Sequence, residues 1–182
     1  MERRLAAILV ADVVGYSTMM EVNETKTLKN LKTMRMETFD PIVDIHGGRI
    51  FKNTGDGALV EFGSAFEAVQ AAVEIQRELS KKNTTVGQTD RISLRVGINL
   101  GDIIVDNNDL YGNGVNVAAR MENLANPGEI CISENVHVHV ANTMDANFQD
   151  LGNQEVKGLD KPIRSYRLVI DLGIMAEDSK GT

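Results

Sequence analysis

Two aspartates stand at the ends of apolar runs and together could hold metal ions. Asp12 ends the run 5–11, and Asp56 lies in Gly55-Asp56-Gly57 between two further apolar runs. Two carboxylates on neighbouring strand ends repel each other unless a cation lies between them. Mg²⁺ favours one or two carboxylates plus substrate phosphates, and two metals about 4 Å apart can assist a phosphoryl displacement. Each aspartate alone fits a cap or a turn, but the pair points to two Mg²⁺ or Mn²⁺ ions.

A lysine and an aspartate have the donor and acceptor character needed to read the edge of a purine. Lys52 precedes the Gly-Asp-Gly segment, and Asp109 follows two asparagines. Adenine presents an acceptor at N1 and a donor amine at C6, which this pair complements, whereas guanine presents the reverse pattern. Buried polar pairs of this kind reject the wrong substrate by about 10⁴-fold. Taken singly, Lys52 also fits a solvated strand residue and Asp109 a polar turn.

An asparagine and an arginine share one face of a helix predicted at 115–124. Asn116 and Arg120 are four positions apart, so they project from the same side of it. Arginine is suited to spreading charge over a phosphoryl group, and in phosphoryl transfer such a residue contributes about 10³ to 10⁵ in rate. The pair can therefore steady a ribose and a phosphorus, although each residue alone also fits a solvated helix position.

The segment after Asp12 is a candidate for holding a triphosphate through its backbone. It leads into the first predicted helix, where amide groups lack partners within the helix and can donate to an anion. Its residues are Val13, Val14, Gly15, Tyr16 and Ser17.

The elements that must position these groups begin with strand, helix, strand and strand. Asn23 is the expected N-cap of a helix reaching Ile42, and Pro41 should kink or end it. The strands 49–54 and 58–62 form a hairpin around the Gly-Asp-Gly turn. A helix and a further strand complete the order of a ferredoxin-like βαββαβ core, an α+β fold. Its first and third strands are antiparallel neighbours, so Asp12 and Asp56 should meet.

The later elements are predicted from capping, turn and apolar patterns. Ser64 and Glu67 form a capping box, and the helix behind it should bury one face. We expect that face to hold Phe66, Val69, Val73 and Ile75. The elements expected after it are a loop at 81–90 and strands at 92–99 and 103–105, which turn at Gly101-Asp102. A strand at 130–133, a helix at 134–140 and short strands from 148 to 170, as a C-terminal extension, should follow.

Composition and charge narrow the classes of protein that fit. The 182 residues suit one domain, expected at 1–170, with 171–182 as a tail or the start of a linker. A net charge of −7 without a dense basic stripe argues against a nucleic-acid partner. No apolar stretch approaches the roughly 20 residues of a membrane span. The lone cysteine, Cys131, fits a buried residue and a reducing, cytoplasmic setting.

Taken together, the six polar residues and their surroundings resemble the class III adenylate/guanylate cyclase catalytic domain, from about Leu5 to Val169. The matching segments are Ala-Asp-Val-Val-Gly-Tyr-Ser, Gly-Asp-Gly, Arg95-Val-Gly-Ile-Asn, Tyr-Gly-Asn-Gly-Val-Asn-Val-Ala-Ala-Arg-Met-Glu and Val156-Lys157-Gly158. Each segment alone is weak evidence, but the ordered set is specific. The chain departs from the family pattern at Glu129, near which some relatives carry a phosphate-binding arginine, and at Gly114, where a β-branched residue is common.

The resemblance implies a nucleotidyl cyclase fold and a role for each of these groups. It implies that Asp12, Asp56 and the Val13 carbonyl bind two divalent ions, and that Lys52 and Asp109 select adenine. It further implies that Asn116 orients the ribose and that Arg120 stabilises the transition state.

The resemblance also implies the reaction and its partners. Lys157 would contact the terminal phosphates while ATP becomes cyclic AMP and pyrophosphate. Because the family's sites lie between two domains, the implied assembly is a homodimer with shared active sites.

Three alternatives compete with an adenylate cyclase. A guanylate cyclase is disfavoured by Lys52 and Asp109. A diguanylate cyclase is disfavoured because its hairpin motif is Gly-Gly-Asp/Glu-Glu-Phe, whereas this chain has Gly-Asp-Gly-Ala. A degenerate cyclase domain, serving as a nucleotide-binding or dimerisation module, would be favoured by the loss of one of the six residues, and all six are present.

Overall fold

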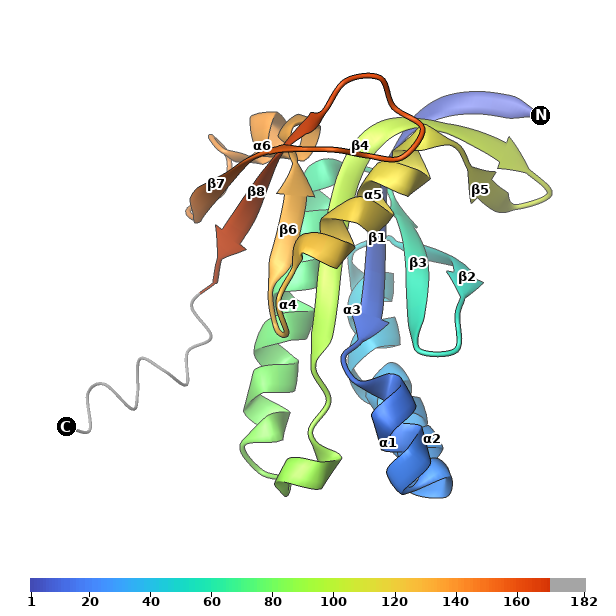
Figure 1. The fold of residues 1–182 in the computed structure, drawn as a ribbon, viewed down its shortest axis with the longest axis vertical. Coiled ribbons are helices and arrows are strands. Elements are labelled where there is room, and N and C mark those ends of the chain that lie inside the picture. The colour runs from blue at the N-terminus through green and yellow to red at the C-terminus, as the bar shows by residue number, and fades with distance from the viewer. Residues whose placement is uncertain (171–182) are drawn as a thin grey trace.

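The protein is built around one twisted β-sheet, as seen in a computed structural model that describes residues 1–170 (Figure 1). The predicted tail at 171–182 lies outside the described residues. The strand order is β2-β3-β1-β4-β6-β8-β7, and β5 pairs with β4. The strands are β1 (Glu2–Val13), β2 (Arg49–Asn53), β3 (Gly57–Phe62), β4 (Leu94–Asp106), β5 (Asp109–Tyr111), β6 (Ile130–Ser133), β7 (Asn147–Gln154) and β8 (Ile163–Val169).

The helices lie on both faces of this sheet, with α5 alone in front of β4 in Figure 1 and α3 and α4 behind it. They are α1 (Tyr16–Val22), α2 (Glu24–Met34), a π-helical turn η1 (Arg35–Phe39), α3 (Asp40–Ile45), α4 (Ala65–Asn83), a 3₁₀ turn η2 (Gln88–Asp90), α5 (Asn113–Leu124) and α6 (Glu134–Val140).

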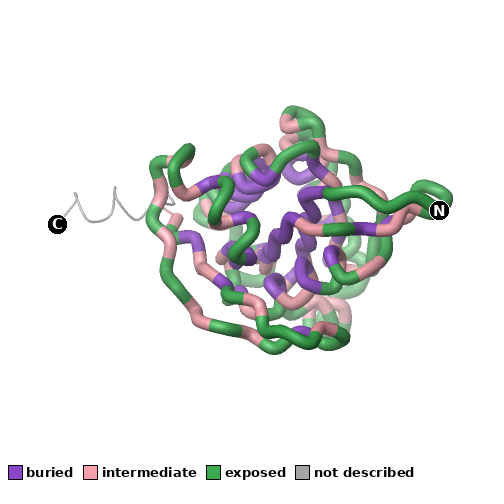
Figure 2. The backbone as a smooth tube through the Cα atoms, turned by 90° about the horizontal axis from the view of Figure 1, so that it is seen from above, coloured by how far each residue is buried: buried purple, intermediate pink, exposed green. Residues whose placement is uncertain are grey.

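Strand β1 is covered on both faces, which explains why its sequence is a continuous apolar run. Ala7, Leu9 and Ala11 belong to the main apolar cluster with α4. Ile8 and Val10 point the other way and pack with Ala118 of α5. Figure 2, seen from above, shows this buried interior enclosed by exposed loops.

The ferredoxin-like prediction is confirmed. Strand β1 runs antiparallel to β3 on one side and to β4 on the other. Asp12 is registered with Gly57, and the Val13 amide donates to the Asp56 carbonyl at 2.8 Å. The end of the first strand therefore meets the start of the third, as the topology requires.

The turn expected at Gly101-Asp102 does not form, because β4 continues through both residues. The two strands predicted at 92–99 and 103–105 are one strand, whose residues Gly101 and Asp102 pair with Ala6 and Leu5 of β1. Pairing along a long neighbour outweighs the local turn preference of a Gly-Asp sequence. The chain instead turns at Asn107 and Asn108, whose φ values are 51° and 67°, a region that asparagine tolerates.

Helix α4 differs from its prediction at both ends. Ser64 caps it as expected, accepting a hydrogen bond from the Glu67 amide at 3.1 Å. Val69, Val73 and Ile75 are buried as predicted, together with several alanines of the helix, but Phe66 is 36% exposed. The helix also continues to Asn83, so the predicted loop at 81–90 is partly helical.

The helix predicted from Asn23 toward Ile42 is confirmed, and part of it has π-helical geometry. Asn23 caps α2 as predicted, accepting from the Lys26 amide at 3.0 Å. The π-helical turn η1 then separates α2 from α3, and Pro41 lies in the first turn of α3. The Asp40 amide donates to the Arg35 carbonyl five residues earlier, and this wider π turn accommodates Pro41, which has no amide to donate.

Helix α5 approaches β4 so closely that a glycine is required between them. A Cβ atom added to Gly97 would meet the Glu122 amide nitrogen and lie 2.5 Å from the Ala118 carbonyl oxygen. Both are backbone atoms, which cannot rotate away as a side chain can. The same constraint applies to Gly114 at the start of the helix, where an added Cβ atom would lie 2.5 Å from the Asp102 carbonyl oxygen.

We predict that Gly97→Ala lowers the free energy of unfolding by about 3 kcal/mol, because α5 must move away from the sheet. Urea denaturation followed by circular dichroism measures this change. Gly87→Ala is the matched control: Gly87 has open space around it and an extended backbone with φ −64°. That variant should be neutral or slightly stabilising, and equal losses in both variants would contradict the close-approach argument.

Candidate active site

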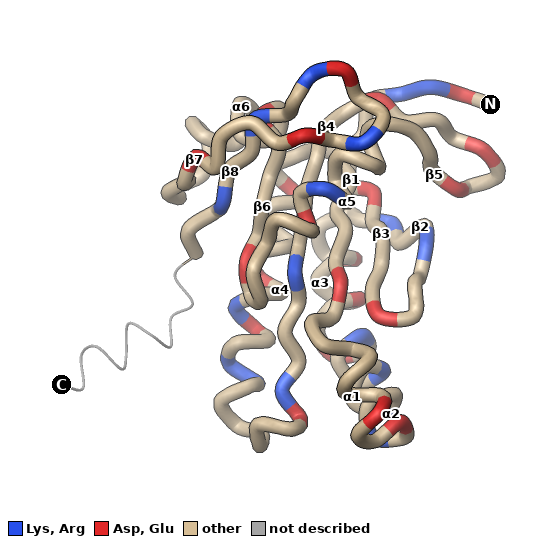
Figure 3. The backbone as a smooth tube through the Cα atoms, viewed as in Figure 1, with Lys and Arg blue, Asp and Glu red and all other residues tan. Residues whose placement is uncertain are grey.

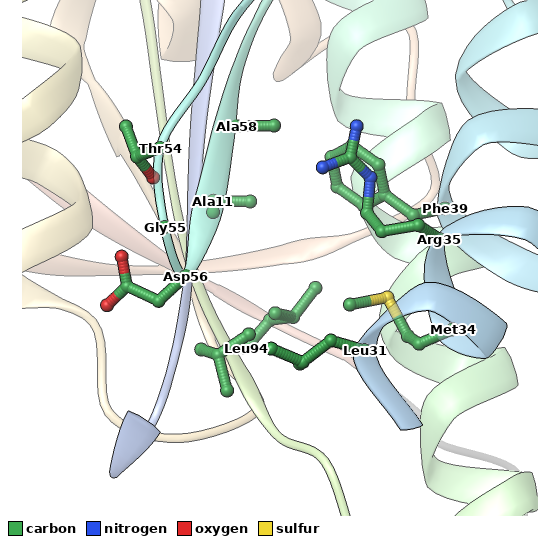
Figure 4. A pocket seen from close by; sticks show the side chains of 12 residues that line it. Ala11, Leu31, Met34, Arg35, Phe39, Thr54, Gly55, Asp56, Ala58 and Leu94 are labelled. Carbon is green, nitrogen blue, oxygen red and sulfur yellow. The ribbon is translucent and has the colours of Figure 1, made fainter. Parts of the chain in front are cut away.

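The predicted metal-binding carboxylates meet at the ends of β1 and the β2–β3 hairpin. Both Asp12 and Asp56 are half-buried, and their carboxyl groups lie within hydrogen-bonding reach of each other. Burial is the main cause that raises the pKa of Asp12 from 3.8 to about 6. The hydrogen bond to Asp56 and the negative charge of that residue raise it further. Figure 4 shows the Asp56 carboxylate pointing away from Leu31 and Met34, which line a small cavity on the helix side of the sheet.

The donor set fits a divalent ion that also binds substrate. Two carboxylates on rigid strand ends, held close enough to raise a pKa, are stabilised by a cation between them. Within residues 1–170 no group of three His, Cys, Asp or Glu side chains could hold a metal. The protein thus offers two carboxylates rather than a closed cage, which matches the preference of Mg²⁺ for substrate phosphates as remaining ligands.

The predicted purine-reading residues lie on two strands, β2 and β5, that contact each other without being paired in the sheet. Lys52 is exposed on β2, and Asp109 is half-buried at the start of β5, and these two strands contact each other. Arg49 of β2 connects this strand to the turn before β5, because its Nη1 donates a hydrogen bond to the Asn108 carbonyl at 3.0 Å. One oxygen of Asp109 accepts from the Leu110 amide at 2.8 Å, and the carboxylate also forms a hydrogen bond with the Tyr111 side chain, so both contacts fix its position.

Helix α5 and the loop between β7 and β8 bring three further predicted residues together. Asn116, Arg120 and Lys157 line one open groove of about 470 Å³. The Arg120 Nε donates to the Glu155 carbonyl at 3.0 Å. Val156 is 5% exposed and packs against α5, so it anchors the loop that carries Lys157. In Figure 1 this loop arches over α5.

The segment predicted to hold a triphosphate is partly committed to the sheet. The Val13 amide donates to Asp56 and the Val14 amide to the Ser93 carbonyl at 2.9 Å. Gly15 has φ 70° and is the N-cap of α1. Helix geometry leaves the amides of Gly15, Tyr16 and Ser17 without a partner in α1. The predicted backbone contacts to a triphosphate are therefore limited to these three amides.

The site residues form three surface clusters in one chain. The carboxylate pair, the purine-reading pair and the α5 groove come from different elements, and the groove is lined only by α5 and residues 156–158. Figure 3 shows basic and acidic positions mixed along the chain, with an acidic position at the turn between β2 and β3.

Sequence reasoning missed a buried carboxyl group near the two aspartates predicted to bind metal. Glu122 is only 6% exposed, and burial, with smaller repulsion from Asp12 and Asp56, raises its pKa to about 7. A signal was available: Gly114, Ala118 and Glu122 are spaced four apart and share one helix face. Small residues at the first two positions mark that face as the one that packs on the sheet.

The fold and these clusters together define a nucleotidyl cyclase catalytic domain, and comparison with known proteins agrees. The family described as "Adenylate and Guanylate cyclase catalytic domain" matches residues 2–169. A protein named "Putative adenylate cyclase 3" from Rhizobium meliloti is 50% identical over 164 residues, which is 90% of this chain and 28% of that protein.

Solved structures give the same result. The crystal structure of an adenylate/guanylate cyclase/hydrolase from Silicibacter pomeroyi is 43% identical with a TM-score of 0.86, covering 94% of this chain and 99% of the other. That of the guanylyl cyclase Cya2 is 26% identical with a TM-score of 0.79, covering 93% of each. The chain belongs to the adenylate and guanylate cyclase catalytic domain family.

Two further facts bear on the whole protein. The chain spans about 28% of the length of the Rhizobium relative. Among the helices within residues 1–170, none combines the length and apolar character that crossing a membrane requires.

The raised pKa of Asp12 predicts how stability depends on pH in the metal-free protein. An acid with a higher pKa in the folded state keeps its proton longer than in the unfolded chain, so folding weakens as pH rises from about 4 to about 6. Asp12→Asn removes the loss of stability that ionisation of Asp12 causes. It should raise the free energy of unfolding at pH 7.5 by about 1 kcal/mol, a figure reduced to allow for the partial exposure of Asp12.

Urea denaturation in EDTA, repeated from pH 4.5 to 7.5, measures this effect. Glu122 also titrates in this range, so the variant should keep a shallower slope than the wild type. Identical slopes would mean that folding does not raise the pKa of Asp12.

Proposed function

We propose that the chain is an adenylate cyclase, which converts ATP to 3′,5′-cyclic AMP and pyrophosphate. Family membership supports cyclase chemistry. The choice of ATP rests on one observation: Lys52 and Asp109 lie on the contacting strands β2 and β5. The lysine donates to N1 of adenine and the aspartate accepts from its amine, whereas guanine would present a donor to the lysine and an acceptor to the aspartate.

Binding and transfer use the groove on α5. Asn116 orients the ribose, and Lys157 pairs with the β- and γ-phosphates. The 3′-hydroxyl loses its proton and attacks the α-phosphorus, while the bond to the bridging oxygen breaks and pyrophosphate leaves. Arg120, held in place through its bond to the Glu155 carbonyl at 3.0 Å, spreads the charge that develops on the α-phosphate.

The carboxylate pair completes the chemistry. When bound at Asp12, Asp56 and the Val13 carbonyl, two Mg²⁺ or Mn²⁺ ions supply Lewis-acid activation of the 3′-hydroxyl and neutralise the triphosphate. Amides of Gly15, Tyr16 and Ser17 at the start of α1 donate to the same phosphates.

We further propose that a complete site forms only between two copies of the chain. The support is that the groove which holds Asn116, Arg120 and Lys157 is lined by neither Asp12 nor Asp56 of the same chain. In a two-fold dimer each copy would give its carboxylates to one site and its groove to the other. The buried single thiol of Cys131 agrees with a cytoplasmic setting.

Specificity tests the assignment of the substrate. The purified chain with Mn²⁺ should make cyclic AMP from ATP at a kcat/KM about 10²-fold or more above that for GTP. Lys52→Glu combined with Asp109→Cys should lower kcat/KM for ATP by a similar factor and raise it for GTP. Mass spectrometry of the products measures both reactions.

Arg3→Gln serves as the control, since it removes a charge on the exposed end of β1. It should leave the preference unchanged. Cyclic GMP as the main wild-type product would show instead a guanylate cyclase, and no cyclic product at any protein concentration would favour a degenerate module.

Complementation tests the shared site. Asp12→Ala and Arg120→Ala should each reduce turnover by at least about 10³-fold. Mixed in equal amounts they should recover about a quarter of wild-type activity, because half of the dimers are mixed and each holds one intact site.

Exchange of subunits must be shown in the same experiment, for example by energy transfer between labelled chains. An inactive mixture whose chains exchange would contradict the composite site. Specific activity that is independent of protein concentration for a monomeric wild type would do the same.

A further inference from the structure

The turn between β4 and β5 leads directly into Asp109 but lies outside the core. Strand β5 is three residues long, and within residues 1–170 it pairs only with β4. Its middle residue, Leu110, is 3% exposed and belongs to the apolar cluster that packs against α5. Asn107 and Asn108, in contrast, are exposed. A short strand that is paired on one side is easily displaced, so the position of Asp109 depends on what else holds this turn.

The two hydrogen bonds of the Asp109 carboxylate do not hold the turn in place, because both lie within β5. The carboxylate accepts from the Leu110 amide at 2.8 Å and bonds to the Tyr111 side chain. These bonds fix the carboxylate relative to its own strand. They do not fix the distance between β5 and β2, the strand that carries Lys52. The edge of a purine is rigid, so its two partners can read it only if that distance is fixed as well.

Arg49 of β2 supplies a contact between β2 and this turn. Its Nη1 donates to the Asn108 carbonyl at 3.0 Å, and this carbonyl belongs to the peptide bond that joins Asn108 to Asp109. Its Nη2 donates to Glu61 of β3 at 3.3 Å. A guanidinium group is planar and donates in fixed directions, so the bond to β3 orients the group toward the turn. Figure 1 shows β2 and β5 on the same side of the molecule.

A β-bulge places Arg49 and Lys52 on the same face of β2. The pairing of β2 with β3 shifts at Phe51. Arg49 is paired with Glu61 before the bulge. Lys52 is paired with Leu59 after it. Directly paired residues point to the same face, and the two partners on β3 are two positions apart and share a face. In a regular strand residues 49 and 52 would point to opposite faces, so the bulge turns Lys52 toward the face on which Arg49 holds the turn.

We propose that Arg49 is a positioning residue for nucleotide selection. By holding the β4–β5 turn against β2, it keeps Asp109 at the separation from Lys52 that the edge of adenine requires. It acts through the Asn108 carbonyl and not by contact with the nucleotide. This inference rests on the proposed function, because it takes Lys52 and Asp109 as the residues that read the base.

Arg49 contributes little to folding, so its removal tests selection rather than stability. Its side chain is 45% exposed, and exposed ion pairs add little to the free energy of unfolding. Arg49→Gln shortens the side chain and removes its charge, so the bond to the Asn108 carbonyl is lost. Urea denaturation followed by circular dichroism should therefore give nearly the same free energy of unfolding as for the wild type.

Arg49→Gln should lower the preference for ATP over GTP about tenfold, the effect of weakening the hydrogen bond between the adenine amine and the Asp109 carboxylate. The kcat/KM for ATP should fall by this factor, mainly through KM, because Asp109 no longer stays in line with the amine. The kcat/KM for GTP should stay the same, because guanine makes neither of the two hydrogen bonds. Since the ratio does not depend on the fraction of folded protein, a purely structural role would leave it unchanged.

Hydrogen exchange followed by mass spectrometry tests the contact itself, without any nucleotide. Exchange in the segment 104–111 should be faster in Arg49→Gln than in the wild type, because the turn is released from β2. The rest of the sheet should exchange as in the wild type.

Arg4→Gln is the matched control. Arg4 is an arginine of β1 whose side chain is 42% exposed, and its Nη2 lies 2.8 Å from the carboxylate of the same Glu61. This variant removes an equal charge from the same acid, whereas the bond from Arg49 to the turn remains. Its nucleotide preference and its hydrogen exchange at 104–111 should match those of the wild type. An equal loss of preference in both variants would show an effect of surface charge and overturn the inference.

The outcomes separate this inference from the proposed function. If Lys52→Glu with Asp109→Cys abolishes a wild-type preference for ATP while Arg49→Gln keeps it, the base-reading residues stand and the inference is overturned. Unchanged hydrogen exchange in Arg49→Gln also overturns it, since Arg49 would then not hold the turn. If the wild type makes mainly cyclic GMP, the proposed function fails, and the inference about adenine selection fails with it even where exchange is faster.

Discussion

The active-site geometry depends on the register of β1 between its two antiparallel neighbours. Pairing with β3 puts Asp12 beside the turn that carries Asp56, and pairing with β4 puts Arg95 opposite Asp12. Because side chains alternate between the faces of a strand, a slip of one residue would turn Asp12 toward α4 and bury it among apolar side chains. The alternating apolar contacts of β1 with both helical layers exclude that slip, so packing in the core fixes the chemistry at the strand end.

The close approach of α5 to β4 gives this helix two separate tasks. Its inner face, with Gly114, Ala118 and Glu122, rests on glycine-bearing parts of β4 and reaches the carboxylate cluster. Its outer face carries Asn116 and Arg120 into the open groove. A helix held by side-chain packing alone would lie farther from the sheet and could not bring Glu122 as near to the strand ends. The same backbone contact therefore supports both halves of the proposed site.

Sequence reasoning succeeded where local patterns and topology agreed. The strand at 130–133 and the helix at 134–140 have the predicted bounds, and the meeting of Asp12 with Asp56 followed from the strand order. It failed at β4, where long-range pairing overrides a Gly-Asp turn signal. The proximity of Lys157 to Arg120 depends on Val156 docking against α5, a contact between distant segments. No local pattern encodes that docking, so only the resemblance to a family suggested it.

The carboxylate cluster shows a conflict between stability and binding that the fold tolerates. Three acids near one arginine weaken the metal-free protein above the pKa values of the acids, and in the proposed function the same excess charge attracts a divalent ion to the strand ends. Glu122 is enclosed beneath α5, whereas Asp12 and Asp56, as the proposed ligands, leave coordination positions open. Open positions are what a substrate triphosphate needs. A cage of three ligands would bind the ion more tightly in the absence of nucleotide and leave less room for the phosphate oxygens on which the chemistry depends.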